Sequence, residues 1–156
     1  MRTTWTFHSA GQVLCGRNAT QQLGEVVAGL NIRRLLLVTD PILMGAGLVD
    51  TVHGPLSEAG VTVELFTGGE PEPSMRAAYQ AITAGRAFRP DGVLGLGGGS
   101  NMDLAKVTAT VLTHGCTLST YVGDGKIPGP ITKKLIDAYS KDVGCDFVGQ
   151  YLKFLQ

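Results

Sequence analysis

Three consecutive glycines, Gly97, Gly98 and Gly99, stand between an apolar run and a helical pattern, and they constrain this chain more than any other feature. Glycine has no Cβ, so such a segment can turn sharply off a strand and bring its backbone close to a ligand. The helix that follows presents N–H groups without helical partners and the positive end of its dipole. The pattern therefore predicts a site for an anion such as a pyrophosphate.

The same segment also fits a plain structural turn. Ser100 and Asp103 have the spacing of a capping box, which any helix start can use. The dinucleotide pattern G-x-G-x-x-G is matched only in part, because Gly95 and Gly97 occupy its first two positions and Ser100 its third. By residue pattern alone, a phosphate site and a tight turn both stay open.

Helical and strand patterns alternate along the chain, which favours right-handed βαβ units and a parallel sheet with helices on both faces. Strands are expected at 33–40, 61–66 and 92–97, and helices at 19–30, 48–59, 75–88 and 100–114. Pro55 is expected to kink or restart the second helix. The sequence thus predicts a Rossmann-like α/β fold with Asp40 and the glycine segment at the carboxyl edge of the sheet, where ligands bind.

Composition limits the partners and the compartment. The chain has 156 residues, the size of one domain, and its thirteen basic residues balance thirteen acidic ones, so no overall field would attract nucleic acid or an anionic membrane. No apolar run approaches the ~18 residues of a membrane span. The three cysteines are far apart and suggest neither a disulfide framework nor a zinc site. We expect a cytoplasmic protein that binds neither nucleic acid nor membrane.

The string GGGSNMDLAK, with VTDPILMGAGLVD upstream and YVGDGKIPGPIT downstream, resembles the cofactor-binding half of the iron-containing, metal-dependent alcohol dehydrogenases. The resemblance begins at about residue 5 and implies an NAD(P)-binding domain over residues 1–132. It implies hydride transfer between an alcohol or carbonyl substrate and nicotinamide. The residues that it assigns to the cofactor are Asp40, Gly97, Gly98, Gly99, Ser100, Asp103 and Lys106.

Asp40 ends the first apolar strand and precedes Pro41. Its carboxylate can accept hydrogen bonds from ribose hydroxyls and would repel a 2′-phosphate, so it favours NAD over NADP. Asp-Pro also begins many turns, and it is the family resemblance that favours ribose recognition. In the expected loop at 68–74, relatives often carry Asn where this chain has Glu72, and we expect Glu72 to be a solvated loop acid.

No reaction site is visible in the sequence. His8, His53 and His114 fall on different expected elements without metal-ligand spacing, and no nucleophile stands in a G-x-S-x-G elbow. In relatives a second domain supplies the ligands of an iron or zinc ion, so this chain is expected to bind no such metal and to lack turnover alone. The alternatives are a non-catalytic dinucleotide-binding module and a truncated or chimeric structural product with a blocked cleft.

Residues 133–156 depart from the family pattern. Their apolar residues recur at a spacing of four, which predicts one or two amphipathic helices interrupted near Gly144 and Gly149. These apolar residues are Leu135, Tyr139, Val143, Phe147, Tyr151 and Leu155. We expect the helical tail to cap the sheet, or to contact a second copy or a complementary chain through its apolar face.

Overall fold

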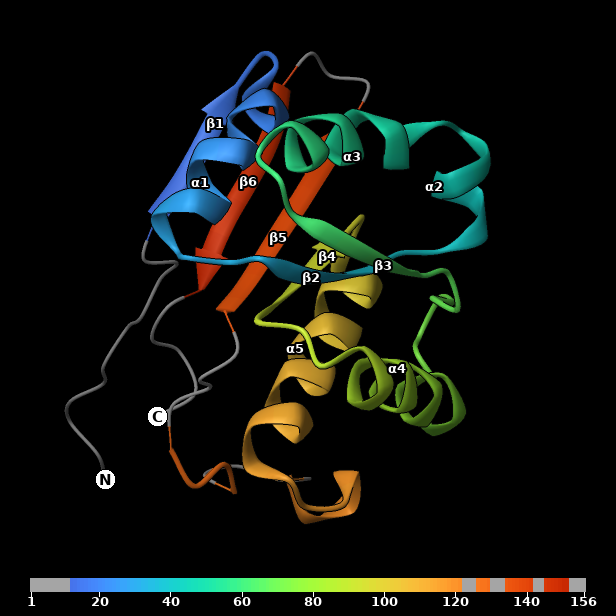
Figure 1. The fold of residues 1–156 in the computed structure, drawn as a ribbon. Coiled ribbons are helices and arrows are strands. Elements are labelled where there is room, and N and C mark those ends of the chain that lie inside the picture. The colour runs from blue at the N-terminus through green and yellow to red at the C-terminus, as the bar shows by residue number, and fades with distance from the viewer. Residues whose placement is uncertain (1–11, 122–125, 130–133, 142–144, 152–156) are drawn as a thin grey trace, which may run out of the picture.

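The computed structural model describes residues 12–121, 126–129, 134–141 and 145–151. They form a six-stranded sheet with the strand order β1-β6-β5-β4-β2-β3 and helices packed against it (Figure 1). The strands are β1 (Gln12–Gly16), β2 (Arg34–Val38), β3 (Thr62–Phe66), β4 (Gly92–Leu96), β5 (Lys134–Lys141) and β6 (Cys145–Tyr151). The helices are α1 (Leu23–Gly29), α2 (Pro41–Gly45), α3 (Leu48–Glu58), α4 (Met75–Phe88) and α5 (Gly99–His114), with 3₁₀ turns η1 (Ala19–Gln22) and η2 (Leu118–Tyr121).

The centre of the sheet is parallel. Strands β3, β2, β4 and β5 run in one direction, and β6 pairs antiparallel with both β5 and β1. All of β4 is buried, and so is β2 from Leu35 to Val38. Such continuous apolar strands suit a sheet that is covered on both faces, because neither side of the strand meets water. The Rossmann-like α/β fold with a parallel sheet is confirmed.

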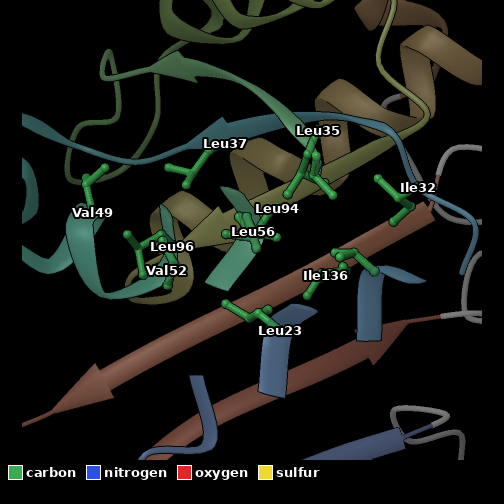
Figure 2. Packing of buried hydrophobic residues seen from close by; sticks show 12 residues of the cluster. Leu23, Ile32, Leu35, Leu37, Val49, Val52, Leu56, Leu94, Leu96 and Ile136 are labelled. Atoms are coloured by element: carbon green, nitrogen blue, oxygen red, sulfur yellow. The ribbon is translucent and has the colours of Figure 1, made fainter. Parts of the chain in front are cut away.

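Alternate residues of β2 contribute to two hydrophobic cores. Leu35 and Leu37 pack with α1 and α3, whereas Leu36 and Val38 pack with α4 and α5. Figure 2 shows the first core, which β4 and, through Ile136, β5 complete. This division follows from the two-residue period of a strand, and it gives the sheet one helical layer on each face.

The described part of the tail is not helical, contrary to the expectation for residues 133–156. Strand β5 extends the parallel sheet beside β4, and β6 returns along β5. A spacing of four residues places side chains on one face of a helix, but it is also twice the strand period and places them on one face of a strand. The edge of β4 decides between the two structures, because its backbone N–H and C=O groups need partners in the sheet.

Parts of the expected tail, residues 133, 142–144 and 152–156, lie outside the described residues, and with them Val143 and Leu155. The contact with a second copy or a complementary chain was expected to use a helix at 133–156, and the described part of that segment consists of strands. Contact with a second copy or a complementary chain stays a prediction. The apolar helix that was expected to make this contact is not present in the described part of the segment.

Helix α3 continues through Pro55 and does not restart there. A proline inside a helix removes one backbone hydrogen bond. Val52 and Leu56 on either side of it are fully buried in the first core, and their burial offsets that loss.

Within the described residues, no helix combines the length and the apolar character that crossing a bilayer requires.

The carboxyl ends of β2, β3 and β4 meet at one edge of the sheet. Val38 is in register with Phe66 of β3 and with Gly95 of β4, so the chain leaves the three strands at nearly the same level. Strands β3 and β4 are successive in the chain but lie on opposite sides of β2. In open α/β sheets, such a reversal of strand order leaves a crevice outside the strand ends, and ligands bind there.

Candidate functional site

A cleft of about 440 Å³ lies at this carboxyl edge. Three segments line it, each following a different strand: residues 40–42 after β2, residues 69–71 after β3, and residues 98–101 after β4. Of the residues expected to bind a cofactor, those that line this cleft are Asp40, Gly98, Gly99 and Ser100. The architecture therefore brings together residues that lie about sixty positions apart in the sequence.

The three glycines at the junction of β4 and α5 have different roles. Gly97 is buried and has a φ of +130°, which L side chains rarely adopt. A Cβ at Gly97 would lie 2.6 Å from Nδ2 of Asn101 and 2.6 Å from Cδ1 of Leu43, so the turn itself requires glycine here. Gly98 and Gly99 are exposed, and a Cβ on either would meet no protein atom within 4 Å. Nothing in the protein's own packing explains glycine at those two positions.

Helix α5 presents hydrogen-bond donors to the cleft. It begins at Gly99, its N-cap Gly98 offers no side chain to the helix, and its first turn holds no acidic residue. The first N–H groups of an α-helix have no intrahelical acceptor and carry the positive end of the dipole. Ser100 lies inside the first turn and is not the N-cap, so the capping box that its spacing with Asp103 left open does not form.

Asp40 caps the short helix α2. Its Oδ1 accepts hydrogen bonds from the backbone N–H groups of Ile42 and Leu43, both at 2.9 Å. Its Oδ2 accepts a hydrogen bond of 2.7 Å from Nδ2 of Asn101. A carboxylate has about four lone-pair sites, so these three bonds leave acceptor capacity beside the cleft. The turn and the ligand-binding interpretations of Asp40 are thus compatible.

Asn101 lines the cleft, and the sequence reasoning missed it. Only 3% of the residue is exposed, and its Nδ2 donates to Asp40 and also to the carbonyl of Leu96, 2.9 Å away. It therefore ties the start of α5 to the ends of β2 and β4. A signal was available, because Leu104 and Thr108 follow at three and seven positions, which places Asn101 on the buried face of the helix.

The loop after β3 closes against these residues. The N–H of Gly69 donates to the carbonyl of Thr39 at 2.9 Å. A Cβ on Gly69 would lie 2.6 Å from that carbonyl oxygen and would collide with Oδ1 of Asn101. Thr39 is fully buried, and its Oγ1 donates to the carbonyl of Leu96 at 3.1 Å. This segment, expected only as a loop, forms one wall of the cleft.

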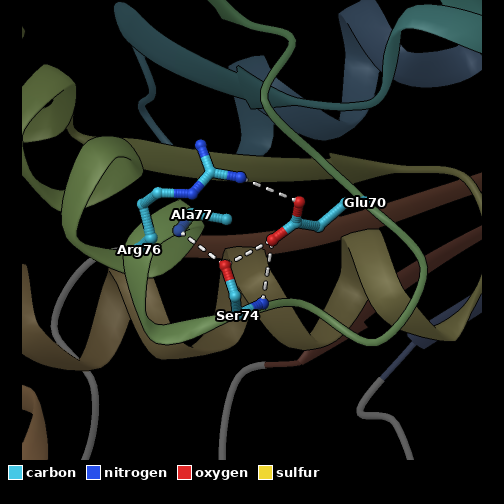
Figure 3. A network of polar contacts seen from close by, with 4 residues as sticks. All are labelled: Glu70, Ser74, Arg76 and Ala77. Atoms are coloured by element: carbon cyan, nitrogen blue, oxygen red, sulfur yellow. Dashed lines mark hydrogen bonds and ion pairs between the residues drawn. The ribbon is translucent and has the colours of Figure 1, made fainter.

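Glu70 lines the cleft and organises the residues before α4 (Figure 3). Its Oε1 accepts hydrogen bonds from the N–H and the hydroxyl of Ser74, and its Oε2 pairs with Arg76 at 3.2 Å. The Ser74 oxygen accepts from the N–H of Ala77 at 3.2 Å and so caps α4. The hydrogen bonds from Ser74 hold the pKa of Glu70 below its ordinary value of 4.5.

Glu72 is exposed, as expected, and its φ of +52° is in the region that favours Asn.

Replacing the N-cap of α4 has a measurable cost. Ser74→Ala is expected to lower the free energy of unfolding by about 1 kcal/mol, because the N–H of Ala77 loses its acceptor. Urea unfolding measures the change. Thr83→Ala is the matched control, since that exposed hydroxyl on α4 bonds only back to the carbonyl of Tyr79, and it should change stability by less than about 0.5 kcal/mol. Equal losses in the two variants would contradict a capping role.

The stability of this loop should also depend on pH. Because folding lowers the pKa of Glu70, the folded chain gains stability above the ordinary pKa of 4.5, and this gain is lost as the pH falls through the lowered pKa. We expect Glu70→Gln to be less stable than the wild type at pH 7 and to approach it at pH 3. Urea unfolding of both proteins at the two pH values measures this. If the two proteins differ in free energy of unfolding by the same amount at pH 7 and at pH 3, the charge of Glu70 is not involved.

Asp103 and Lys106 lie farther along α5. They form an ion pair with 3.3 Å between Asp103 Oδ1 and Lys106 Nζ, and the Asp103 side chain is 69% exposed. They line a second cavity of about 310 Å³, together with Val107, Thr110, Leu118, Tyr121 and Ile127. The structure sets this pair apart from the cleft at Asp40, and its contact with a cofactor stays a prediction.

The reversed strand order and the glycine-lined cleft at the helix N-terminus define a Rossmann-like α/β domain, the class in which ligands bind at the carboxyl edge of the sheet. The family model for iron-containing alcohol dehydrogenases matches residues 10–137, which include the start of β5. This chain belongs to the iron-containing alcohol dehydrogenase family.

Several known proteins are similar to this chain. Long-chain-alcohol dehydrogenase 1 of Geobacillus thermodenitrificans is 37% identical over 107 residues, which are 69% of this chain and 27% of that protein. Choline dehydrogenase of Bacillus subtilis is 37% identical over 129 residues, which are 82% of this chain and 32% of that protein. The chain thus spans about a third or less of the length of these relatives.

Solved structures agree with the fold. A crystal structure of 1,3-propanediol oxidoreductase matches with a TM-score of 0.71 at 27% identity, over 88% of this chain and 40% of that one. An NADH-dependent butanol dehydrogenase A from Thermotoga maritima matches with a TM-score of 0.77 over 86% of this chain and 34% of that one. At 24% identity, the second likeness shows the fold alone.

The residues described do not fit the metal that the family name implies. Across residues 12–121 and the shorter described segments, no three His, Cys, Asp or Glu side chains come together as metal ligands. His53 lies on α3 and His114 at the end of α5, where its buried Nε2 has no hydrogen-bond partner in the described structure. His8 lies outside the described residues. No chemical step through a metal is therefore assigned to the cleft.

Proposed function

We propose that this chain binds NAD in the cleft between β2, β3 and β4, and that it acts as the cofactor-binding part of an alcohol dehydrogenase. The observation that carries the proposal is the open space at Gly98 and Gly99. Neither glycine is needed by its own backbone or by a neighbouring protein atom. A ligand that approaches the backbone to hydrogen-bond distance would need both, because a side chain at either position would occupy the ligand's place.

The chemistry of the cleft suits the two ends of an adenosine diphosphate. The N–H groups at the start of α5 suit a pyrophosphate, and the Ser100 hydroxyl beside them can donate another hydrogen bond. The carboxylate of Asp40 suits the hydroxyls of the adenosine ribose. When bound, the nicotinamide of such a cofactor accepts or donates hydride.

We propose further that binding without turnover is what these residues do alone. The chain spans 27% and 32% of two relatives named for an alcohol and for choline, so their catalysis draws on much more sequence than is matched here. Substrate choice and metal binding would then belong to the part of such enzymes outside the match. Of the described residues, none after Asn101 lines the cleft, which favours an open cofactor site over a blocked one.

Thermal unfolding with and without NAD tests the proposal. At about 100 times its dissociation constant, NAD should stabilise the fold by about 2.7 kcal/mol, or roughly 5–11 °C for a domain of this size. A parallel assay follows NADH absorbance with a primary alcohol and added Fe²⁺ or Zn²⁺, and no turnover is expected. The absence of a thermal shift would refute cofactor binding, and turnover by the purified chain would refute the proposed lack of catalysis.

The charge of Asp40 should select NAD over NADP, because its carboxylate would face the 2′-phosphate. Asp40→Asn keeps an oxygen that can cap α2 but removes the charge, so it should reduce the preference for NAD by about tenfold. Its amide nitrogen would face Nδ2 of Asn101 in place of an acceptor, so the free energy of unfolding should fall by about 1–3 kcal/mol. Calorimetric titration with both cofactors measures the ratio of the dissociation constants. Asp50→Asn on α3 removes a charge outside the cleft and should leave that ratio unchanged. An unchanged ratio in Asp40→Asn would contradict the assignment.

A further inference from the structure

The amide of Asn101 is directed out of its own helix. On the same buried face of α5, the hydroxyl of Thr108 bonds back to the carbonyl of Leu104 at 2.7 Å. Nδ2 of Asn101 instead donates to the end of β4 through the carbonyl of Leu96 and to Oδ2 of Asp40. An amide nitrogen carries two hydrogens, and these two acceptors use both. Because a buried amide without partners is costly, the pair of bonds defines its orientation.

Two glycines from different loops confine this amide. Gly97 approaches Nδ2, where a Cβ would lie at 2.6 Å, and Gly69 approaches Oδ1, where a Cβ would collide with that oxygen. The side chain therefore has close backbone neighbours at both ends. The closeness of these two glycines to Asn101 explains why neither position has room for a larger residue.

We propose that Asn101 is a positioning residue for the carboxylate of Asp40 in dinucleotide recognition. The inference rests on the proposed binding of NAD. By holding Oδ2 from one side, the amide fixes the plane of the carboxylate and leaves the remaining acceptor site of Oδ2 for the ribose. Asn101 also belongs to the first turn of α5, whose N–H groups are proposed to bind the pyrophosphate. Its hydrogen bond to Asp40 therefore fixes the position of the ribose-binding carboxylate relative to those N–H groups.

The test compares NAD with an analogue that lacks the 2′-hydroxyl of the adenosine ribose. Calorimetric titration gives the ratio of the two dissociation constants for the wild type, Asn101→Ala, Asp40→Ala and the double variant. A hydrogen bond to a carboxylate predicts a wild-type ratio of about tenfold or more in favour of NAD. We expect Asn101→Ala to reduce this ratio to about threefold, and both variants without Asp40 to bring it to about one.

The ratio separates positioning from simple structural support. A merely structural loss would weaken both ligands by the same factor and leave the ratio unchanged. Thr108→Ala is the matched control, since it removes a buried hydrogen bond of α5 away from the cleft and should not move the ratio. If Asn101→Ala folds poorly, Asn101→Ser replaces it, because one hydroxyl proton can satisfy only one of the two acceptors.

The outcomes distinguish this inference from the proposed function. A wild-type ratio retained in the Asn101 variants would overturn the positioning role while NAD binding by the wild type still stood. If Asn101→Ala changes the ratio of the two dissociation constants in a chain that already carries Asp40→Ala, the positioning role is overturned as well. No binding of NAD to the wild type would overturn both the proposed function and this inference.

Discussion

Gly98→Asp is expected to abolish NAD binding without weakening the fold. The new carboxylate would stand where the pyrophosphate is proposed to bind, and two like charges about 4 Å apart near a protein surface repel by about 4 kcal/mol. The dissociation constant should therefore rise at least about a hundredfold. Gly98 is the N-cap of α5 with an extended backbone, a position where Asp is favourable, so the free energy of unfolding should hold or increase. Titration calorimetry and urea unfolding measure the two effects.

Gly98→Asn separates charge from size. Asn has nearly the same shape as Asp and caps helices equally well, but it carries no charge. We expect its loss of NAD affinity to be smaller than that of Gly98→Asp by about tenfold or more. Equal losses would show that bulk alone closes the site. Wild-type affinity in Gly98→Asp would mean that the glycine segment is a plain turn.

Gly97→Ala is expected to lower the free energy of unfolding by about 3 kcal/mol, the sum of a strained φ and a disturbed buried amide. The new methyl would press on Asn101 and on Leu43, and the φ of +130° is unfavourable for alanine. The midpoint of thermal unfolding should fall by roughly 6–12 °C. NAD binding should weaken as well, because the buried amide holds Asp40.

Gly99→Ala is the matched control for that variant. It lies at the first position of α5, and its Cβ would meet no protein atom, so stability should hold or rise by about 0.5–1 kcal/mol. Its methyl would still enter the cleft, and NAD binding should weaken. A loss of stability in Gly99→Ala as large as in Gly97→Ala would contradict the distinct roles of these glycines.

Much of the fold could be predicted from short segments of sequence. The contiguous apolar residues of β2 and β4 carry their own signal, because a strand buried on both faces needs apolar side chains at every position. The glycine segment that follows β4 and the Asp40-Pro41 pair also carry their own signal, because their residue types are those that a local turn requires. Those residues define two of the three walls of the cleft.

The prediction of a helical tail was wrong because residues far apart in the sequence decide the structure of that segment. The spacing of four from Leu135 to Tyr139 and from Phe147 to Tyr151 suits both a helix and a strand. Only the unfilled edge of β4 selects the strand. The spacing of Ser100 and Asp103 left a capping box open, and the structure decides against it, because α5 begins one residue before Ser100, after the turn at Gly97. Local pattern could not distinguish these alternatives.

The sequence by itself determined the alternation of strands and helices and the glycine turn, because each depends on residues within a few positions of one another. It also determined the family resemblance, because each of the three strings that carry it is a short continuous segment. Only the tertiary structure decided that Asn101 holds Asp40 across 61 positions and that Gly69 closes against Thr39 and Asn101. The reason is physical: a buried amide must find its hydrogen-bond partners wherever the packed strands place them, and its own segment does not reveal where that is.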